Sequence, residues 1–260
     1  MNAPTRFGMI AALAACVQSY IIADPGDLVR ILDSPCEAPV DLAYDTSTDT
    51  YWVSTFTGGA ICQLNSTLDR ELARVEAPFD NPLFATATGL AVDSRRGRLY
   101  VADARSATIH ELTRGGQPTG RVIPVILRTD VEPSFIAGLA FNPRGAGGRG
   151  TLFTVDQEAG IIYEVDLTGR TLRSFPDPED PERFLGDGSS PSLSDVDLIF
   201  DELGNLSGFY VSAAFGAYYS LLELDLDGRW TGVRVRLAQA GADGSALTSI
   251  ARRNFARADG

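Results

Sequence analysis

The order of apolar and polar residues along the chain repeats about every fifty positions. One short apolar run that ends in aspartate or asparagine occurs four times, at 41–45, 89–93, 138–142 and 197–201. The last residues of successive runs are 48, 49 and 59 positions apart. Each run is followed by a turn and by a second apolar run of strand length. A repeat of this length built only of short strands predicts a β-propeller, in which every repeat forms one blade.

Every repeat supplies four strand-like segments that are separated by turn residues. The expected strands are 40–44, 51–55, 60–64 and 70–76; 89–92, 98–102, 107–112 and 121–127; 138–141, 151–155, 160–165 and 170–175; and 196–200, 208–212, 219–224 and 230–237. Glycines in the turns 166–170 and 225–229 supply the positive φ of a tight reversal. The chain is therefore predicted to be all-β, with four-stranded antiparallel blades.

The number of blades depends on the two ends of the chain. A fifth inner strand is expected at 247–250, with no further strand after it. The N-terminal segments 19–23 and 28–32 could complete that blade, which gives about five blades in a ring closed by both termini. Alternatively, the chain is a truncated six-bladed propeller. We favour closure, because an open ring would expose strand edges that proteins normally protect.

The N-terminus has two interpretations. Arg6 precedes an apolar stretch, and residues 13–16 have the form of a bacterial lipoprotein cleavage site that ends in Cys16. This pattern predicts a signal peptide over 1–16, a lipidated Cys16 and one propeller domain over 17–260. The protein would then be secreted, periplasmic or a membrane-anchored lipoprotein of a bacterium. In the alternative, residues 8–32 are strands of a blade.

The remaining cysteines, Cys36 and Cys62, form an even pair if the protein is exported. They flank strands of one blade, so they could form a disulfide or remain as two buried thiols. A zinc site is not expected, because the chain has no CxxC motif and His110 is its only histidine. We expect His110 to be exposed on a strand, far from the channel mouth.

The charge of the chain excludes one class of partner. The formal net charge is −12, and all 22 basic residues are arginines. A protein that binds nucleic acid needs a basic surface for the phosphates, so a nucleic-acid partner is not expected. An acidic surface is compatible with binding of cations.

The second repeat carries a family resemblance. Residues 87–93, 97–103 and 109–112 together resemble an NHL repeat, and the other three copies resemble weaker relatives. The wider group includes the gluconolactonase/regucalcin proteins and the streptogramin lyases. This resemblance implies a propeller that is either a binding platform, as most NHL proteins are, or a metal-dependent hydrolase like the gluconolactonases.

One face of such a propeller is expected to bind the ligand. It contains the loops from second to third strands and from fourth to first strands, around the mouth of the central channel. The candidate contacts on this face are Phe56, Arg105, Gln157, Glu158, Phe215 and Tyr218. The arginine-containing turns 94–97 and 144–149 belong to the opposite face, where we expect ordinary turns.

Asp41 and Asp197 are candidate metal ligands. In this alignment they occupy a position that is glycine in the second and third repeats. Two carboxylates near one channel would repel each other unless a cation such as calcium or magnesium lay between them, and Asp195 and Glu37 could add ligands. In the alternative, each aspartate accepts hydrogen bonds from backbone N–H groups.

Two functions follow from these patterns. The sequence favours a non-catalytic, exported scaffold that binds a protein, a glycan or a small molecule through its loop face. A membrane would be contacted only through the N-terminal lipid anchor. The alternative is a lactonase or esterase in which Asp41, Asp197 and Glu37 hold a divalent cation that polarises a carbonyl and activates water.

Overall fold

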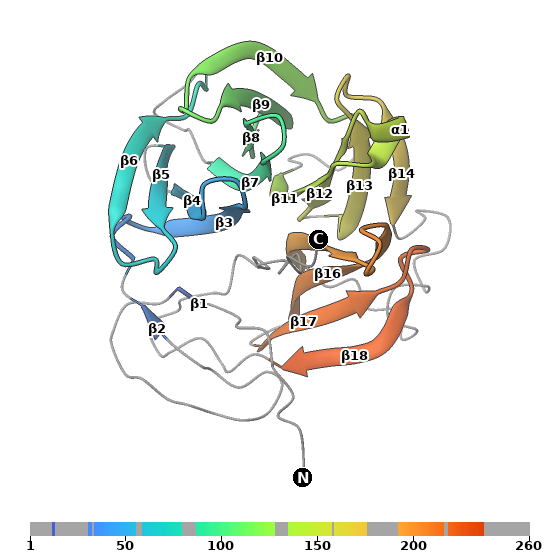
Figure 1. The fold of residues 1–260 in the computed structure, drawn as a ribbon. Coiled ribbons are helices and arrows are strands. Elements are labelled where there is room, and N and C mark those ends of the chain that lie inside the picture. Colours follow the sequence, from blue (N-terminus) through green and yellow to red (C-terminus); the bar gives the residue numbers. More distant parts are fainter. Residues whose placement is uncertain are drawn as a thin grey trace.

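The computed structural model describes residues 34–55, 59–79, 87–127, 135–157, 159–175, 192–215 and 218–236, and the short segments 12–13 and 31–32. Most of these residues form four antiparallel sheets of four strands, arranged as blades around a common centre (Figure 1). The predicted all-β propeller with four-stranded blades is confirmed.

Each blade uses four consecutive strands, from the inner strand at the centre to the outer strand at the rim. Blade 1 contains β3 (Pro39–Asp45), β4 (Thr50–Thr55), β5 (Ala60–Asn65) and β6 (Glu71–Glu76). Blade 2 contains β7 (Ala87–Asp93), β8 (Arg98–Asp103), β9 (Thr108–Thr113) and β10 (Pro118–Pro124). Blade 3 contains β11 (Ile136–Asn142), the helical turn α1 (Gly145–Gly148), β12 (Thr151–Asp156), β13 (Ile161–Asp166) and β14 (Thr171–Phe175). Blade 4 contains β15 (Ser192–Phe200), β16 (Leu206–Phe215), β17 (Tyr218–Leu224) and β18 (Trp230–Arg236).

The described residues form four blades, where the sequence predicted about five. The expected inner strand 247–250 and the expected strand 19–23 lie outside the described residues. Within the expected strand 28–32, β2 (Ile31–Leu32) pairs in parallel with β1 (Ala12–Leu13) and with no blade strand. A parallel ladder of two residues cannot supply the missing strands of an antiparallel blade, so no fifth blade is present in this part of the chain.

The recurring aspartate or asparagine at the end of each inner run closes the turn to the second strand. Its side-chain oxygen accepts a hydrogen bond from a backbone N–H two or three residues later, in Asp45–Ser47, Asp93–Arg96, Asn142–Arg144 and Asp201–Leu203. These short polar side chains mimic a backbone turn, which explains why the repeat preserves them.

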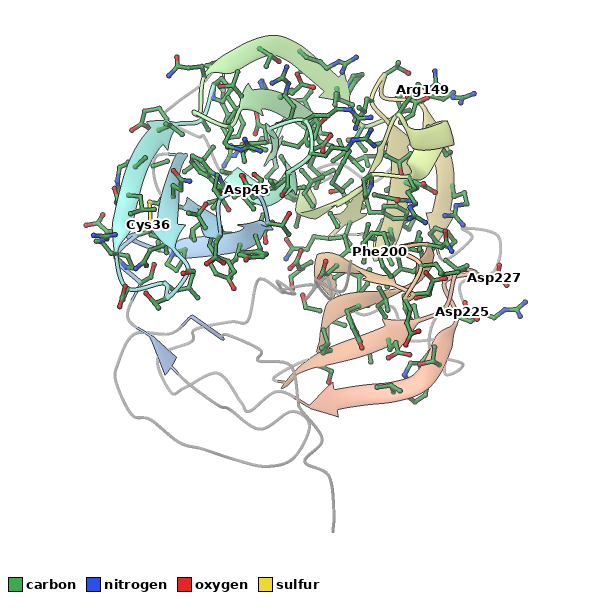
Figure 2. The ribbon with its side chains drawn as sticks, viewed as in Figure 1. Cys36, Asp45, Arg149, Phe200, Asp225 and Asp227 are labelled. Atoms are coloured by element: carbon green, nitrogen blue, oxygen red, sulfur yellow. A yellow bond between two sulfur atoms is a disulfide. The ribbon has the colours of Figure 1, made fainter. Side chains whose placement is uncertain are left out.

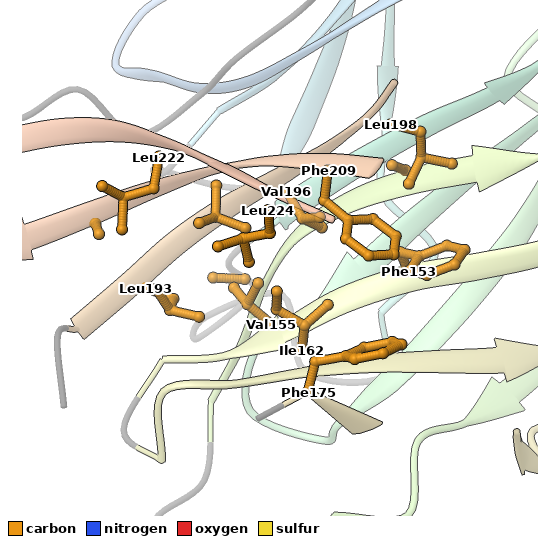
Figure 3. Packing of buried hydrophobic residues seen from close by; sticks show 14 residues of the cluster. Phe153, Val155, Ile162, Phe175, Leu193, Val196, Leu198, Phe209, Leu222 and Leu224 are labelled. Carbon is orange, nitrogen blue, oxygen red and sulfur yellow. The ribbon is translucent and has the colours of Figure 1, made fainter. Parts of the chain in front are cut away.

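The hydrophobic core lies between neighbouring blades. The middle strand β13 is buried at all six positions, because blades pack against both of its faces, whereas most of the outer strand β6 is accessible to solvent. Between blades 3 and 4 the core contains Phe153, Ile162, Phe175 and Phe209 (Figure 3). Each such side chain contributes about 1.5–3 kcal/mol when fully buried.

The inner strands approach one another closely at two glycines. A Cβ atom added to Gly89 of β7 would lie 2.7 Å from the carbonyl carbon of Gly138 in β11. A Cβ atom on Gly138, whose φ is 57°, would lie 2.5 Å from the Cα atom of Asp195 in β15. Both distances are too short for a real contact, so glycine sets the spacing of the inner strands of blades 2, 3 and 4.

In the described part of the chain, no helix is long and apolar enough to cross a membrane.

Candidate functional site

The inner strands of all four blades line one cavity at the centre of the molecule. Its volume is about 310 Å³. The apolar part of its wall includes Leu42, Leu90, Leu139 and Leu198, one leucine from each inner strand. Phe200, at the end of β15, also lines it. This central cavity is the candidate ligand site of the described residues.

The cavity extends toward the end of the channel that lies opposite the predicted ligand face. Its wall includes Thr46, Ser94, Arg95 and Pro143, which belong to the turns that leave the inner strands β3, β7 and β11. These turns lie opposite the predicted ligand face. The turn 94–97 was expected to be an ordinary turn, yet two of its residues line one end of the cavity.

The predicted ligand face is only partly described. Arg105 is exposed in its turn, where its backbone N–H donates to Asp103, and the backbone N–H of Gln157 donates to the carbonyl of Phe135. Neither side chain lines the central cavity. The remaining candidates fall outside the described parts: Phe56 and Glu158 entirely, and Phe215 and Tyr218 in their side chains.

Asp41 connects two blades through its carboxylate. The side chain is 2% exposed, and its Oδ1 accepts the N–H of Leu42 at 2.6 Å. Its Oδ2 accepts the N–H of Leu90, in the inner strand of blade 2, at 2.5 Å. The backbone N–H of Asp41 donates to Ser54 Oγ at 3.1 Å. Both carboxylate oxygens therefore bind backbone N–H groups, which is the alternative that the sequence left open beside metal binding.

Asp195, and not Asp197, occupies the position that corresponds to Asp41. Asp41 pairs with Ser54 on the second strand, and Asp195 pairs with Ser212 in the same way. Asp195 is also buried, and its Oδ1 accepts the N–H of Val196 at 2.8 Å. Alignment on the final aspartate of each run assumed hairpins of equal length. The assumption fails because Asp195 and Ser212 are 17 positions apart in the sequence, whereas Asp41 and Ser54 are 13 positions apart.

Asp197 instead takes a position that is alanine in the other three blades. It pairs with Tyr210, as Ala43, Ala91 and Ala140 pair with Trp52, Tyr100 and Phe153. Its Oδ1 accepts the N–H of Leu198 at 2.8 Å, and the residue lines the central cavity. A carboxylate therefore stands in the cavity wall at a level where the other inner strands present a methyl group.

The four carboxylates that were predicted to hold calcium or magnesium do not form one group. Glu37 is exposed, and its charge acts on the outer strand β6: Glu71 first, and Glu37 less, raise the pKa of the Arg74 guanidinium. Among the described residues, the one set of three side chains with metal-ligand spacing is Cys36, Cys62 and Glu71. A disulfide joins the two cysteines of this set.

The cysteine pair fixes the segment that leads into blade 1. Cys36 precedes β3 and Cys62 lies in β5, with Cα atoms 6.5 Å apart. Both side chains are buried, beside Leu42, Val53 and Leu64. Figure 2 shows Cys36 next to this blade. The disulfide is one of the two arrangements that the sequence left open.

His110 is buried, which corrects the prediction of an exposed histidine. The residue is 9% exposed, and its ring meets the edge of Phe79 with centroids 5.2 Å apart. It pairs with Val101, so both side chains lie on the face of blade 2 that contacts Phe79. The sequence around His110 alternates as an exposed strand would, but the neighbouring blade covers this face.

Arginines connect neighbouring blades at the turn end of the channel. Arg114 of blade 2 donates from Nε to Asp45 of blade 1 at 2.9 Å, and from Nη2 to the carbonyl of Ser94 at 2.6 Å. Burial raises the pKa of Asp45, but hydrogen bonds from Ser47 and Ser94 and the charge of Arg114 outweigh it. The pKa of Asp45 therefore lies below its ordinary value of 3.8.

The next two blade junctions use arginine in the same way. Arg96 of blade 2 donates to Asp93 at 2.8 Å and to the carbonyl of Gly148 in blade 3 at 2.7 Å. Arg144 of blade 3 donates to Asn205 of blade 4 at 2.7 Å. Sequence reasoning missed these contacts, although the signal was present: arginine recurs in the turns that follow the inner strands.

Comparison with known proteins establishes the fold. No family model matches the sequence, and no curated protein matches it. Glutaminyl cyclase from Myxococcus xanthus superposes with a TM-score of 0.52 at 12% identity, over 94% of this chain and 78% of that chain. Because the identity is so low, this likeness shows the β-propeller fold and nothing of the chemistry. Membership of the NHL group stays a prediction.

Other solved structures are similar at lower scores. Hydrazine synthase from Kuenenia stuttgartiensis gives a TM-score of 0.47 at 16% identity over 79% of this chain. The β-propeller domain of Cps50 (Swd1) from Myceliophteria thermophila gives 0.46 at 12% identity, over 79% of this chain and 57% of that chain. The present chain spans 51% of the hydrazine synthase chain, about half of its length.

We predict that Asp41→Ala destabilises the protein by about 2–5 kcal/mol, because it leaves two buried N–H groups without their acceptor. Asp41→Asn, which keeps one carbonyl oxygen, should cost less. Unfolding in denaturant, monitored by tryptophan fluorescence, measures the difference. The control is Asp227→Ala, an exposed aspartate at the rim (Figure 2), which should change the stability by less than about 0.5 kcal/mol.

The same variant separates the two interpretations of Asp41. If its loss of stability is the same with and without calcium or magnesium, Asp41 is a structural acceptor. A loss that appears only when one of these cations is present would contradict this role and favour a metal ligand.

Proposed function

We propose that this protein is an exported, NHL-type β-propeller that acts as a binding scaffold and holds its ligand in the central cavity. The observation that carries the proposal is the cavity of about 310 Å³ that the inner strands of all four blades line together. Pockets for small molecules have volumes of about 300–1,000 Å³ and mostly apolar walls with a few polar groups. The central cavity meets both conditions.

The size of the cavity favours a small molecule among the three predicted kinds of partner. A protein or glycan would need an extended surface, such as the loop face that contains Arg105 and Gln157. The cavity instead is small, and each of the four inner strands contributes a leucine to its wall. These features favour a compact molecule as the ligand. Neither nucleic acid nor a membrane surface is part of this proposal, apart from an N-terminal lipid anchor.

The alternative as a lactonase or esterase has no specific support in the described residues. It requires several carboxylates that converge on one divalent cation. Both oxygens of Asp41 accept backbone N–H groups, and Glu37 lies beside the outer strand. The contacts of Asp41 and Glu37 therefore do not favour the hydrolase or its calcium or magnesium site.

We predict that Thr46→Trp blocks ligand binding, because Thr46 is an exposed residue of the cavity wall and an indole ring there would fill the entrance. A fragment library screened by ligand-observed NMR should give binders that the wild-type protein retains and Thr46→Trp loses. Gln117→Trp, an exposed change in a turn away from the cavity, is the matched control and should keep them. The proposal fails if every fragment that binds the wild type also binds Thr46→Trp.

The disulfide supports the proposed export. Cys36 and Cys62 are joined in the structure, and disulfides persist mainly in oxidising compartments such as the bacterial periplasm. The sequence pattern that ends in Cys16 would direct the chain there and add a lipid. Residue 16 itself lies outside the described residues.

We expect metabolic labelling with palmitate to mark the wild-type protein when it is expressed in a bacterium, because lipidation of Cys16 would attach the fatty acid. Cys16→Ser should abolish the label. Titration of thiols in denaturant should show that Cys36 and Cys62 remain oxidised in both proteins. Equal labelling of the two proteins, or free thiols at both Cys36 and Cys62, would contradict export as a lipoprotein.

A further inference from the structure

The turns that follow the inner strands of blades 2 and 3 carry only positive charge. Segments 94–97 and 143–150 contain four arginines and no acidic residue, in a chain whose formal net charge is −12. The corresponding turns of blades 1 and 4, at 46–49 and 202–204, each contain one acidic residue and no arginine. Because the central cavity reaches the turn of blade 2, one side of its turn end is basic and attracts anions.

The polar side chains of the cavity wall fall into two groups. Four of them make hydrogen bonds within the protein: Tyr44, Asp93, Ser94 and Asp197. The other two, Thr46 and Arg95, are exposed, and within the described ranges their side chains have no hydrogen bond and no ion pair. A guanidinium can only donate hydrogen bonds, and a threonine hydroxyl can donate one. These two side chains therefore favour a ligand group that accepts hydrogen bonds.

Thr46 and Arg95 lie on adjoining turns. The backbone N–H of Thr46 donates to Ser94 Oγ at 3.0 Å, and Ser94 directly precedes Arg95. This contact connects the turns of blades 1 and 2 at the cavity wall. The two donors therefore stand at the same end of the cavity, where one ligand group can meet both.

Arg95 differs from the arginines around it. Three others at this end bind a neighbouring blade: Arg96, Arg114 and Arg144. Arg95 has no such contact in the described part of the chain, so the blade junctions do not depend on it. Its guanidinium offers two parallel N–H donors, which match the two oxygens of a carboxylate.

The carboxylates of the wall limit the charge of the anion. Asp93 is buried and accepts from Arg96 Nη1 at 2.8 Å, so a positive charge already compensates it. Asp197 corresponds in register to Ala91, four positions before Arg95, and so lies in a strand and not in the turn. A dianion such as a phosphate would be repelled more strongly by these two groups than a single carboxylate.

The rest of the wall determines the body of the ligand. One leucine from each inner strand lines the cavity, so the body is apolar. A cavity of about 150 Å³ holds one benzene molecule. The volume of about 310 Å³ therefore has room for about two fused rings.

We propose that the central cavity binds a small amphipathic carboxylate. The carboxylate accepts hydrogen bonds from the Arg95 guanidinium and the Thr46 hydroxyl, and the apolar body packs against the leucines of the inner strands. This inference rests on the proposed function, because it names the ligand class of the same cavity.

Three probes that share one naphthalene ring test the proposal: 2-naphthoate, 2-naphthamide and 2-naphthylmethylamine. At pH 7 they are an anion, a neutral molecule and a cation. We expect 2-naphthoate to bind the wild-type protein about tenfold more tightly than either of the others, because only its acceptor oxygens are charged. Titrations followed by protein NMR give the three dissociation constants. The advantage of 2-naphthoate should shrink at high salt, which screens the charge of an exposed arginine.

Two variants test the two contacts. Arg95→Gln should weaken 2-naphthoate about tenfold and leave 2-naphthamide unchanged. Thr46→Val, which removes the hydroxyl and keeps the shape, should weaken 2-naphthoate about threefold. The matched control is Arg149→Gln, the same change of charge at an exposed arginine that does not line the cavity (Figure 2). It should alter none of the three constants. Melting temperatures verify that all variants fold.

The outcomes distinguish this inference from the proposed function. If the three probes bind equally, or none binds, while Thr46→Trp still removes fragments, the selection of a carboxylate is wrong and the scaffold proposal stands. If Thr46→Trp removes neither probes nor fragments, the cavity is not the binding site and both proposals fail. A preference for 2-naphthoate that survives Arg95→Gln, an unchanged constant in Thr46→Val, or an equal loss in Arg149→Gln would overturn the inference.

Discussion

The backbones of neighbouring inner strands lie so close together that no side-chain carbon fits between them at Gly89 and Gly138. This constraint places the backbone of β7 against that of β11, and the backbone of β11 against Asp195 of β15. At the junction of blades 1 and 2, a side chain joins the inner strands instead: the Asp41 carboxylate accepts the N–H of Leu90 in β7. The spacing of the inner strands sets the width of the central cavity and how closely neighbouring blades pack.

The remaining interactions secure this arrangement farther from the axis. Second-strand aromatics such as Trp52 and Tyr100, each 1% exposed, fill the space between blades where the sheets diverge. At the turn end, Arg114, Arg96 and Arg144 close the three junctions with hydrogen bonds to the next blade. Guanidinium suits this task better than ammonium, because its planar donors can reach a carboxylate and a carbonyl at once.

The architecture could be predicted from the sequence because the repeat consists of strand periodicity and turn residues, which are local signals. Sequence reasoning placed the four inner strands and the aspartate or asparagine that closes the turn after each of them. It misplaced Asp197, because one longer hairpin in blade 4 shifted the alignment by two residues, and this length is set by pairing between strands. It predicted an exposed His110 and ordinary arginine turns. Both predictions were wrong because they depend on which neighbouring blade covers a residue. The cavity depends on the same tertiary information, and it lies at the channel end that local patterns did not favour.

The stability of Gly89→Ala tests the close packing of the inner strands most directly, because the added methyl group would collide with the backbone of Gly138. Gly115→Ala is the control, since Gly115 lies in an exposed turn where an added Cβ meets only the Thr113 hydroxyl at 3.8 Å. From unfolding in denaturant, we predict a loss of about 1–3 kcal/mol for Gly89→Ala and a change within about 0.5 kcal/mol for Gly115→Ala. Equal stabilities of Gly89→Ala and the wild type would contradict the packing on which the propeller and its cavity depend.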